Sequence, residues 1–161
     1  MTGYEFPKIT EEHDANWLMV HVDVTFKDQR FQNASPCLLA SDLLDIAFWF
    51  DQLFFGKLPG WICNGFIEPN LEFEVYRSTD AIVRFGIRLS HESKPPFEIS
   101  RKDDTSETCV FELTYPELAE VAASFRLIAD QFPTRHFDKR TVAKIRKYSE
   151  HFQGQLRRRF N

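Results

Sequence analysis

The sequence predicts an α+β domain in which an antiparallel sheet of about five to six strands is packed by two main helices, with a basic helix at the C-terminus. Three observations lead to this fold class. Several segments alternate apolar and polar side chains, as half-buried strands do, and two segments carry apolar side chains at helical spacing. Phe accounts for 17 of the 161 residues, so we expect an aromatic-rich core.

The first predicted strands follow a polar, turn-like segment at residues 2–14. Between Trp17 and Phe26 every second residue is apolar, and these residues should face the core: Leu18, Val20, Val22, Val24 and Phe26. A turn at residues 27–29 leads to a weaker strand from Arg30 to Leu39. Pro36 interrupts this strand, which fits an edge strand or a bulge because proline cannot donate to a strand ladder.

The two main helices have start and stop signals. Ser41 is a candidate N-cap for the first helix, and Gly56 is a natural stop. Thr114 and Glu117 predict a capping box for the second helix, which Pro133 ends. The apolar stripe of the first helix is Leu43, Leu44, Ala47, Phe50, Leu53 and Phe54, and that of the second is Leu118, Val121, Ala122, Phe125, Ile128 and Phe132.

A central hairpin is predicted between residues 66 and 89. Two runs alternate there, with Leu71, Phe73 and Val75 inward in the first and Ala81, Val83, Phe85, Ile87 and Leu89 inward in the second. A loop at residues 78–80 would set Val75 opposite Val83 and Glu74 beside Arg84. We reject a two-residue turn, because a slip by one residue would pair apolar with charged positions. Residues 60–66 are a short strand or a loop, 91–106 a loop, and 107–113 a last strand.

We predict two parts in the chain, a single α+β domain at residues 1–135 and a basic helical extension at residues 136–161. The net charge of −4 hides a difference between them. The extension carries eight Lys or Arg and two acidic residues, so the domain has a charge of −10, with 12 basic and 22 acidic residues. An acidic body with a basic tail bears on the choice of partners rather than on the fold.

The composition indicates a cytoplasmic protein that does not enter a membrane. The sequence contains no apolar run near the roughly 20 residues that cross a bilayer, and its N-terminus lacks the pattern of a secretion signal. The three cysteines, Cys37, Cys63 and Cys109, are widely spaced, which argues against a disulfide framework and a zinc site.

The sequence shows no pattern typical of an enzyme. It has no H-E-x-x-H, G-x-S-x-G, P-loop or G-x-G-x-x-G motif, and its five histidines are scattered. Cys109 lies on the inward face of a predicted strand, where a thiol is more often inert than nucleophilic. We therefore predict no catalytic residue, no cofactor and no metal site, and a protein that is not an enzyme.

Two charged surfaces have more than one interpretation. The acidic residues near the central hairpin are either a solvated face or a surface that attracts a basic protein partner, since charge complementarity speeds association and selects partners. The basic tail could grip nucleic-acid phosphates, complement its own helix C-terminus, or fold back onto the acidic body. The sequence leaves these alternatives open, and it leaves the oligomeric state unknown.

Five phrases in a fixed order resemble a known family. They are G-Y-E-F-P at residues 3–7, N-W-L at 16–18, E-P-N-L-E-F-E at 68–74, K-P-P-F at 94–97 and F-P-T-R at 132–135. Together they resemble the WapI-type immunity proteins, small bacterial cytosolic proteins, over roughly residues 3–135. E-P-N-L-E-F-E is the most specific of the five, and it is also explained as a folding signature that starts a strand and supplies a core Phe.

The resemblance implies an inhibitor without catalytic activity. In the family's type case, the partner is the nuclease part of a large wall-associated toxin, and the immunity protein blocks its action on transfer RNA. A nuclease active site is usually basic, so an acidic body could mimic its substrate's charge. The hypothetical partner-binding residues are Glu68, Glu72, Glu74, Tyr76, Trp17 and Asp14. The alternative is a small cytosolic domain of other function whose basic tail contacts nucleic acid.

Overall fold

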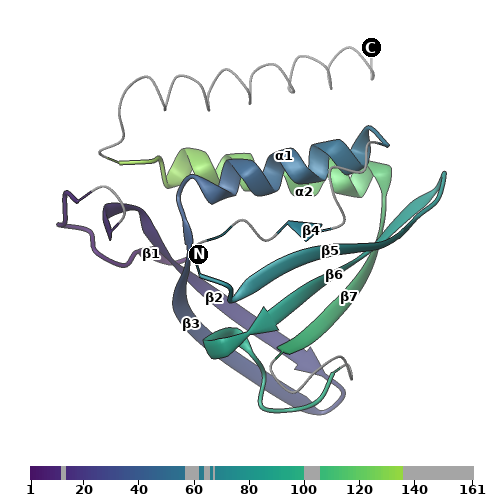
Figure 1. Cartoon of the computed structure of the whole chain (residues 1–161), viewed down its shortest axis with the longest axis horizontal. Helices are drawn as coiled ribbons and strands as arrows, with labels where there is room; N and C mark the ends of the chain where they lie inside the picture. The colour runs from purple at the N-terminus through teal and green to yellow at the C-terminus, as the bar shows by residue number, and fades with distance from the viewer. Residues whose placement is uncertain (12–13, 57–61, 64–65, 67, 100–105, 136–161) are drawn as a thin grey trace.

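The structure is a computed structural model that describes residues 1–11, 14–56, 62–63, 66, 68–99 and 106–135. It is an α+β arrangement in which two helices lie side by side over antiparallel sheets (Figure 1). The predicted basic helix and the whole extension from residue 136 fall outside the described residues. Neither helix in the described part of the chain has the length and apolar character needed to cross a membrane.

The described strands form two sheets rather than the single sheet that we predicted. The first contains β1 (Gly3–Tyr4), β2 (Trp17–Phe26) and β3 (Gln29–Leu39), in that order, with a short 3-10 turn η1 (Asp14–Asn16) before β2. The second contains β4 (Ile62–Cys63), β5 (Leu71–Ser78), β6 (Ile82–Ser90) and β7 (Ser106–Thr114), with η2 (His91–Ser93) after β6. The single-sheet prediction was wrong because alternation assigns faces to a strand but does not identify its lateral neighbours.

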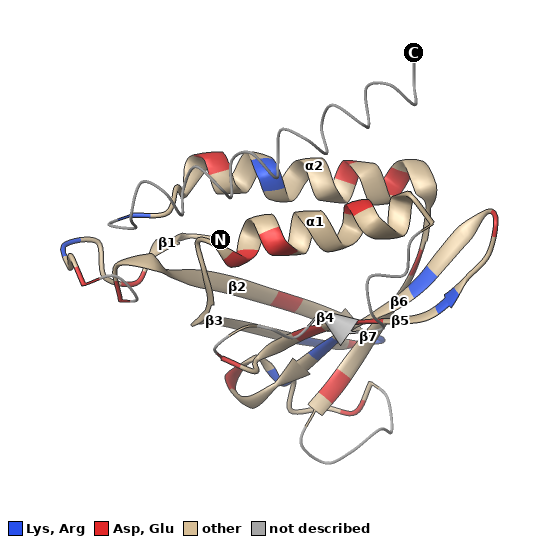
Figure 2. Cartoon of the chain, turned by 45° about the horizontal axis from the view of Figure 1, so that its top comes forward, with Lys and Arg blue, Asp and Glu red and all other residues tan. Residues whose placement is uncertain are grey.

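Helices α1 (Asp42–Phe54) and α2 (Tyr115–Gln131) pack on the sheets and on each other (Figures 1 and 2). Phe50 of α1 is 1 % exposed and lies at the centre of the core. Its ring centroid is 5.8 Å from that of Phe73, 5.5 Å from that of Phe85 and 6.1 Å from that of Phe125. Spacings of this size are favourable for aromatic pairs, and they confirm the prediction of an aromatic-rich core.

The helix ends were predicted in part. Thr114 and Glu117 form the expected capping box, and Gly56 adopts a φ of +65° just after α1, as a helix stop requires. Ser41 occupies the N-cap position of α1, as predicted, but its side chain makes no capping hydrogen bond. The carboxylate of Asp42, the first residue of α1, accepts a 2.8 Å bond from the backbone N–H of Leu39 at the end of β3.

The central hairpin has the predicted faces but a different register. Val75 pairs with Phe85 rather than with Val83, and a bulge at residue 76 shifts the pairing near the turn by one residue. The backbone N–H of Thr79 donates to Ile82 O over 2.9 Å, so the hairpin closes around residues 80 and 81. The bulge restores the apolar pairing that a two-residue turn alone would destroy, which is why our rejection of that turn failed. The Glu74–Arg84 pair predicted from the other register is absent from the strand pairing, where Glu74 lies opposite Gly86.

The first hairpin carries a second bulge. Leu18 pairs with Leu38 and Met19 with Pro36, so Cys37 is the extra residue on β3. β3 is an edge strand of the described sheet, so both explanations offered for Pro36 are correct. The alternation predicted for β2 is confirmed, since Leu18 is fully buried and Val20, Val22 and Val24 pack against the core.

A buried ion pair joins the two helices. The guanidinium of Arg126 on α2 donates to the carboxylate of Asp51 on α1, whose side chain is fully buried. Burial raises the pKa of Asp51, while the positive charge of Arg126 and its hydrogen bond lower it. We did not predict this pair, because Asp51 and Arg126 lie 75 residues apart and neither helical pattern identifies the other helix as its neighbour.

The N-terminal segment and the end of the described chain are held together by Arg135. Its guanidinium donates to Pro7 O over 3.0 Å, to Phe6 O over 3.1 Å and to Ala15 O, and it lies 3.7 Å above the ring of Tyr4. One planar cation therefore satisfies three backbone carbonyls and stacks on an aromatic face, a combination that lysine cannot reproduce.

Two further contacts complete this arrangement. The side chain of Asn16, which is fully buried, donates to Arg135 O over 2.8 Å and accepts from Arg135 N over 2.7 Å. The hydroxyl of Tyr4 donates to Pro133 O, and its ring meets that of Phe132 edge-on with 5.8 Å between centroids. We call Tyr4, Asn16, Phe132 and Arg135 the Arg135 clasp.

We predict that Arg135→Lys lowers the free energy of unfolding by about 1–3 kcal/mol, because an ammonium cannot donate to all three carbonyls. Urea unfolding measures the change. The backbone N–H of Glu5, which bonds to Trp17 O in the segment that the clasp holds, should also exchange with deuterium faster. Arg30→Lys on the exposed face of β3 is the control, and an equal loss in both variants would contradict the role given to Arg135.

We predict that Asp42 makes the protein less stable as pH rises. Burial raises its pKa to about 6 from an ordinary value of 3.8, which outweighs the lowering by the Leu39 hydrogen bond. The folded state therefore binds the proton more tightly than the unfolded state, and this advantage is lost as pH rises through about 6. Asp42→Asn, which keeps an oxygen for Leu39, should be more stable than the native protein at pH 7.5 by on the order of 2–3 kcal/mol.

The measurement is urea unfolding of the native protein and Asp42→Asn between pH 4 and pH 7.5. The difference between them should shrink toward pH 4, where Asp42 is protonated in the folded state and the pH approaches its ordinary value of 3.8 in the unfolded state. The exposed Asp130→Asn on α2 is the matched control and should follow the native protein at every pH. A constant difference across the range would show that the proton on Asp42 has no such effect.

Candidate functional site

The Arg135 clasp places Glu5 beside Trp17. β1 pairs with β2 so that Tyr4 lies opposite Leu18, and the backbone N–H of Glu5 continues the ladder by donating to Trp17 O over 2.9 Å. Residues directly opposite one another in an antiparallel pair project from the same face of the sheet. Glu5 and Trp17 therefore share a face, which is the face opposite to that of the buried Leu18.

This face forms part of a surface hollow of about 260 Å³. Three segments of the chain that are distant in sequence surround it: the first sheet, the residues just before β5, and η2. The lining residues are Glu5, Trp17, Ser35, Pro36, Glu68, Asn70 and Glu92. We call it the acidic hollow, because three of the seven described residues in its lining are glutamates and none of these seven is Lys or Arg.

The glutamates in its lining give the hollow a negative charge. Burial raises the pKa of Glu5, and the charge of the nearby Asp14 raises it further. In the described part of the chain, Glu5, Glu68 and Glu92 have no ion pair that would neutralise them. A site that gathers like charges without a counterion attracts a positive group.

Ser35 adds an unsatisfied polar group to the lining. Its side chain is 8 % exposed, and its Oγ has no hydrogen-bond partner among the described residues. A buried hydroxyl without a partner is uncommon, since it loses its bonds to water without replacement.

The arrangement does not suit a metal ion. No three His, Cys, Asp or Glu side chains within the described ranges are grouped so that they could hold one.

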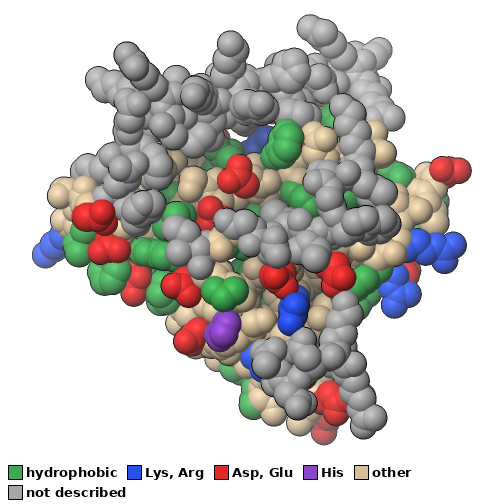
Figure 3. Space-filling model, viewed as in Figure 1, with side chains coloured by type: hydrophobic (Ala, Val, Ile, Leu, Met, Phe, Trp, Pro, Cys, Tyr) green, Lys and Arg blue, Asp and Glu red, His purple; other side chains and the backbone are tan. Residues whose placement is uncertain are grey.

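The structure brings together only some of the residues predicted for a partner surface. Trp17 and Glu68 line the hollow, and Asp14 lies close enough to influence Glu5. Glu72, Glu74 and Tyr76 lie farther along β5, on the face of the second sheet that points away from the core. On the face shown in Figure 3, acidic side chains are scattered among hydrophobic and basic ones.

Side chains on the outer face of β5 make more contacts within the protein than we expected from the sequence. The carboxylate of Glu72 accepts a 3.2 Å bond from Arg88, which also donates to the hydroxyl of Ser106 over 2.7 Å. The ring of Tyr76 covers Gly86, where an added Cβ would lie 2.8 Å from the tyrosine oxygen. Tyr76 therefore replaces the side chain that glycine lacks.

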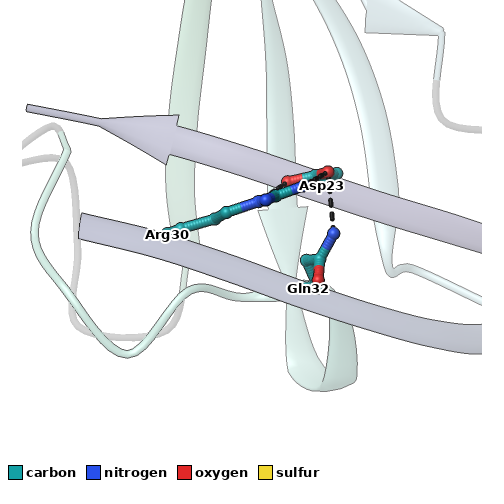
Figure 4. Close-up of polar contacts among 3 residues, drawn as sticks. All are labelled: Asp23, Arg30 and Gln32. Atoms are coloured by element: carbon teal, nitrogen blue, oxygen red, sulfur yellow. Dashed lines mark hydrogen bonds and ion pairs between the residues drawn. The ribbon is translucent and has the colours of Figure 1, made fainter. Parts of the chain in front are cut away.

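The carboxylate of Asp23 is also hydrogen-bonded within the protein. Arg30 donates to both of its carboxylate oxygens, over 2.9 and 2.5 Å, and Gln32 donates to one of them over 2.8 Å (Figure 4). The Arg30 and Gln32 hydrogen bonds lower the pKa of Asp23 to about 2. This carboxylate is thus bound within β2 and β3, in contrast to those of the hollow.

Sequence reasoning missed Glu5, Ser35, Asn70 and Glu92 as members of the site. A signal was available for two of them, because Glu5 belongs to G-Y-E-F-P and Asn70 to E-P-N-L-E-F-E. Glu92 lies two positions before Lys94, the first residue of K-P-P-F. Ser35 had no signal, since only packing makes it a buried hydroxyl.

The phrases that carried the family resemblance meet in space. G-Y-E-F-P, N-W-L and E-P-N-L-E-F-E each supply a residue to the hollow, and F-P-T-R supplies the Arg135 clasp beside it. Separate stretches of sequence thus build one end of the molecule.

Comparison with known proteins gave one match. Neither a curated protein nor a solved structure matched the chain. Residues 1–133 match the Immunity protein WapI-like family, a range that includes every lining residue of the hollow and all of the clasp except Arg135. The chain therefore belongs to the WapI-like immunity protein family.

Proposed function

We propose that this chain is an immunity protein that binds a cognate nuclease toxin in the bacterial cytoplasm and neutralises it by occlusion, without catalysis. Membership of the WapI-like family over residues 1–133 is the observation that carries the proposal. We further propose that residues 1–135 are the toxin-binding domain and that residues 136–161 are an extension to it.

The charge of the domain supports a basic partner. Residues 1–135 carry −10, and a nuclease that acts on a polyanion presents a basic surface to its substrate. An acidic inhibitor approaches such a surface quickly and covers it, because opposite potentials steer the encounter.

The proposed contact surface has two neighbouring parts. One is the rim of the acidic hollow, with Asp14, Trp17 and Glu68, and the other is the outer face of β5, with Glu72, Glu74 and Tyr76. Trp17 and Tyr76 are each half-buried, so part of each ring remains available to a partner. Aromatic side chains of this kind are frequent among the residues that dominate binding energy.

The low reactivity of Cys37 and Cys109 supports an inhibitor that forms no covalent bond with its partner. Burial raises the pKa of the Cys37 thiol to about 12, with smaller contributions from the charges of Asp42 and Glu68. Burial also raises the pKa of Cys109, and the charge of Glu107 adds to this. Both groups remain thiols at neutral pH, and a thiol is a poor nucleophile.

We predict that Glu72→Lys combined with Glu74→Lys reduces binding to the toxin by at least about tenfold, because two attractive charges become repulsive. The tests are growth of cells that co-express the toxin domain and titration calorimetry of the purified pair. Circular dichroism must show that the double variant remains folded, since Glu72 normally pairs with Arg88.

Glu120→Lys on the exposed side of α2 is the matched control and should protect cells as well as the native protein does. If the double variant protects equally well and binds with unchanged affinity, the outer face of β5 is not part of the contact. If the native protein neither protects cells nor binds, the proposed function itself is wrong.

A further inference from the structure

We propose that the basic extension, residues 136–161, folds back as an amphipathic helix onto the outer face of the α1–α2 pair. Both described sheets lie on one side of this pair (Figures 1 and 2), and the outer face is the opposite side. Three observations carry the inference: a row of apolar side chains on that face, the negative charge of the two helices, and a complementary pattern in the extension. The inference does not depend on the identity of any toxin.

Apolar side chains form a row on the outer face. At about 100° per residue, Leu44, Phe48 and Phe55 of α1 project within about 40° of one another. They lie on the opposite side of the helix from the buried Leu53. Phe48 is 36 % exposed, and Leu127 on the outward side of α2 is 64 % exposed. Single exposed apolar residues are ordinary, but several on one face mark a contact surface.

The charge of the helix pair selects a basic occupant. Together α1 and α2 carry six acidic residues and one basic residue, Arg126, which is bound to the buried Asp51 (Figure 2). Asp45 of α1 and Glu120 of α2 are exposed beside the apolar row. An occupant with a basic border and an apolar centre would match this face, whereas a nucleic acid would meet like charge.

The extension has the complementary pattern. It carries eight Lys or Arg against two acidic residues. Its apolar side chains fall at helical spacing, at Val142, Ile145, Tyr148, Phe152 and Leu156. In a helix the apolar stripe would cover the row on α1 and α2, and the basic side chains would lie near the acidic ones.

The extension also begins at a suitable place and is long enough. The Arg135 clasp fixes the chain just beyond α2, so the extension starts at one end of the helix pair. A helix over residues 138–158 would be about 30 Å long, and the 17 residues of α2 span about 25 Å. A tethered segment has an effective concentration on the order of millimolar, which favours it over a separate basic protein or a second copy.

This arrangement gives the extension a place in the fold. The sequence left open whether the basic tail grips nucleic acid, complements its own helix end, or folds back onto the acidic body. The outer face of the helix pair is the part of the body that offers both apolar area and negative charge. Basic residues that lie against it are less available to nucleic-acid phosphates.

Amide hydrogen exchange of the full-length protein tests whether the extension is held. An isolated helix of about 20 residues is marginal in water, and Gly154 weakens this one further. A free extension should therefore exchange almost as fast as an unfolded chain. If it is docked, the amides of residues 142–156 should exchange at least about tenfold more slowly than that. Exchange at the rate of an unfolded chain would overturn the proposal.

Variants identify the face that holds the extension. Leu127→Lys should reduce the protection of residues 142–156 by at least about fivefold, because it removes apolar area and repels the basic side chains. Phe48→Lys should act in the same way. Val110→Lys on β7 is the matched control, since it changes a side chain that is 44 % exposed on a strand and should leave the protection unchanged. Full protection in both helix variants, or an equal loss in Val110→Lys, would contradict the proposal.

Zero-length crosslinking of the native protein needs no variant. A carbodiimide joins a lysine amine to a carboxylate only when the two groups meet. Mass spectrometry of the monomer should find links from the three lysines of the extension to Asp45 or Glu120. Links confined to Glu68 in the acidic hollow or to Glu72 on β5 would place the extension elsewhere and overturn the inference.

Other occupants of the face give different results. If a second copy supplies the extension, the links appear in a crosslinked dimer and protection increases with protein concentration. If the extension serves nucleic acid, its amides are protected only after an RNA oligonucleotide is added, and this protection is lost at high salt. Either result would overturn the fold-back. Neither bears on the proposed function, which growth of cells that co-express the toxin tests separately.

Discussion

The bonds of Arg135 are the interaction on which the candidate site depends. One guanidinium satisfies three backbone carbonyls in the segments before β2, and its own backbone is fixed by the buried Asn16. The short strand β1 has only two residues, so its own ladder could hardly hold the N-terminal segment against β2. The cation at the far end of the described chain supplies the missing constraint, and Glu5 takes its place beside Trp17 as a consequence.

The acidic residues of the protein fall into two physical groups. Some are bound within the fold: Asp51 by Arg126, Glu72 by Arg88, Asp23 by Arg30 and Gln32, and Glu117 by the cap of α2. Those that line the hollow have no such partner among the described residues. A paired carboxylate contributes less field at a distance than an unpaired one, so Glu68 should attract a basic partner more strongly than Glu72 does. The overall charge of an inhibitor is therefore a poor guide to where its partner binds.

The sequence phrases that suggested the family lie close together at one end of the folded molecule. The family match spans residues 1–133, and the phrases that suggested it from sequence lie around the hollow and the clasp. Part of this agreement is structural, because Tyr4, Asn16 and Phe132 hold the chain together. Glu5 and Glu68 have no comparable structural task, since their carboxylates bind nothing within the described residues.

The sequence by itself determined which faces of the strands are buried and where α2 begins. Side-chain alternation in β2, β5 and β6 predicted most of the inward residues correctly, because a strand with one face in water buries every second side chain. Ala81 is an exception, since it lies before β6 and is exposed. The capping box of Thr114 and Glu117 was equally predictable, since it depends on residues three apart. These features are local, and local spacing is what a single sequence records.

Only the tertiary structure decided the features that depend on distant residues. With the bulge at Tyr76, the observed register of the hairpin differs from the predicted one by two residues and leaves the faces unchanged, so no apolar pattern could reveal it. The division into two sheets and the pairing of Arg126 with Asp51 depend on which elements become neighbours. The hollow joins residues from positions 5 to 92, and packing places three glutamates in its wall that have no ion pair among the described residues. Proximity between segments so far apart in the chain is a property of the folded state alone.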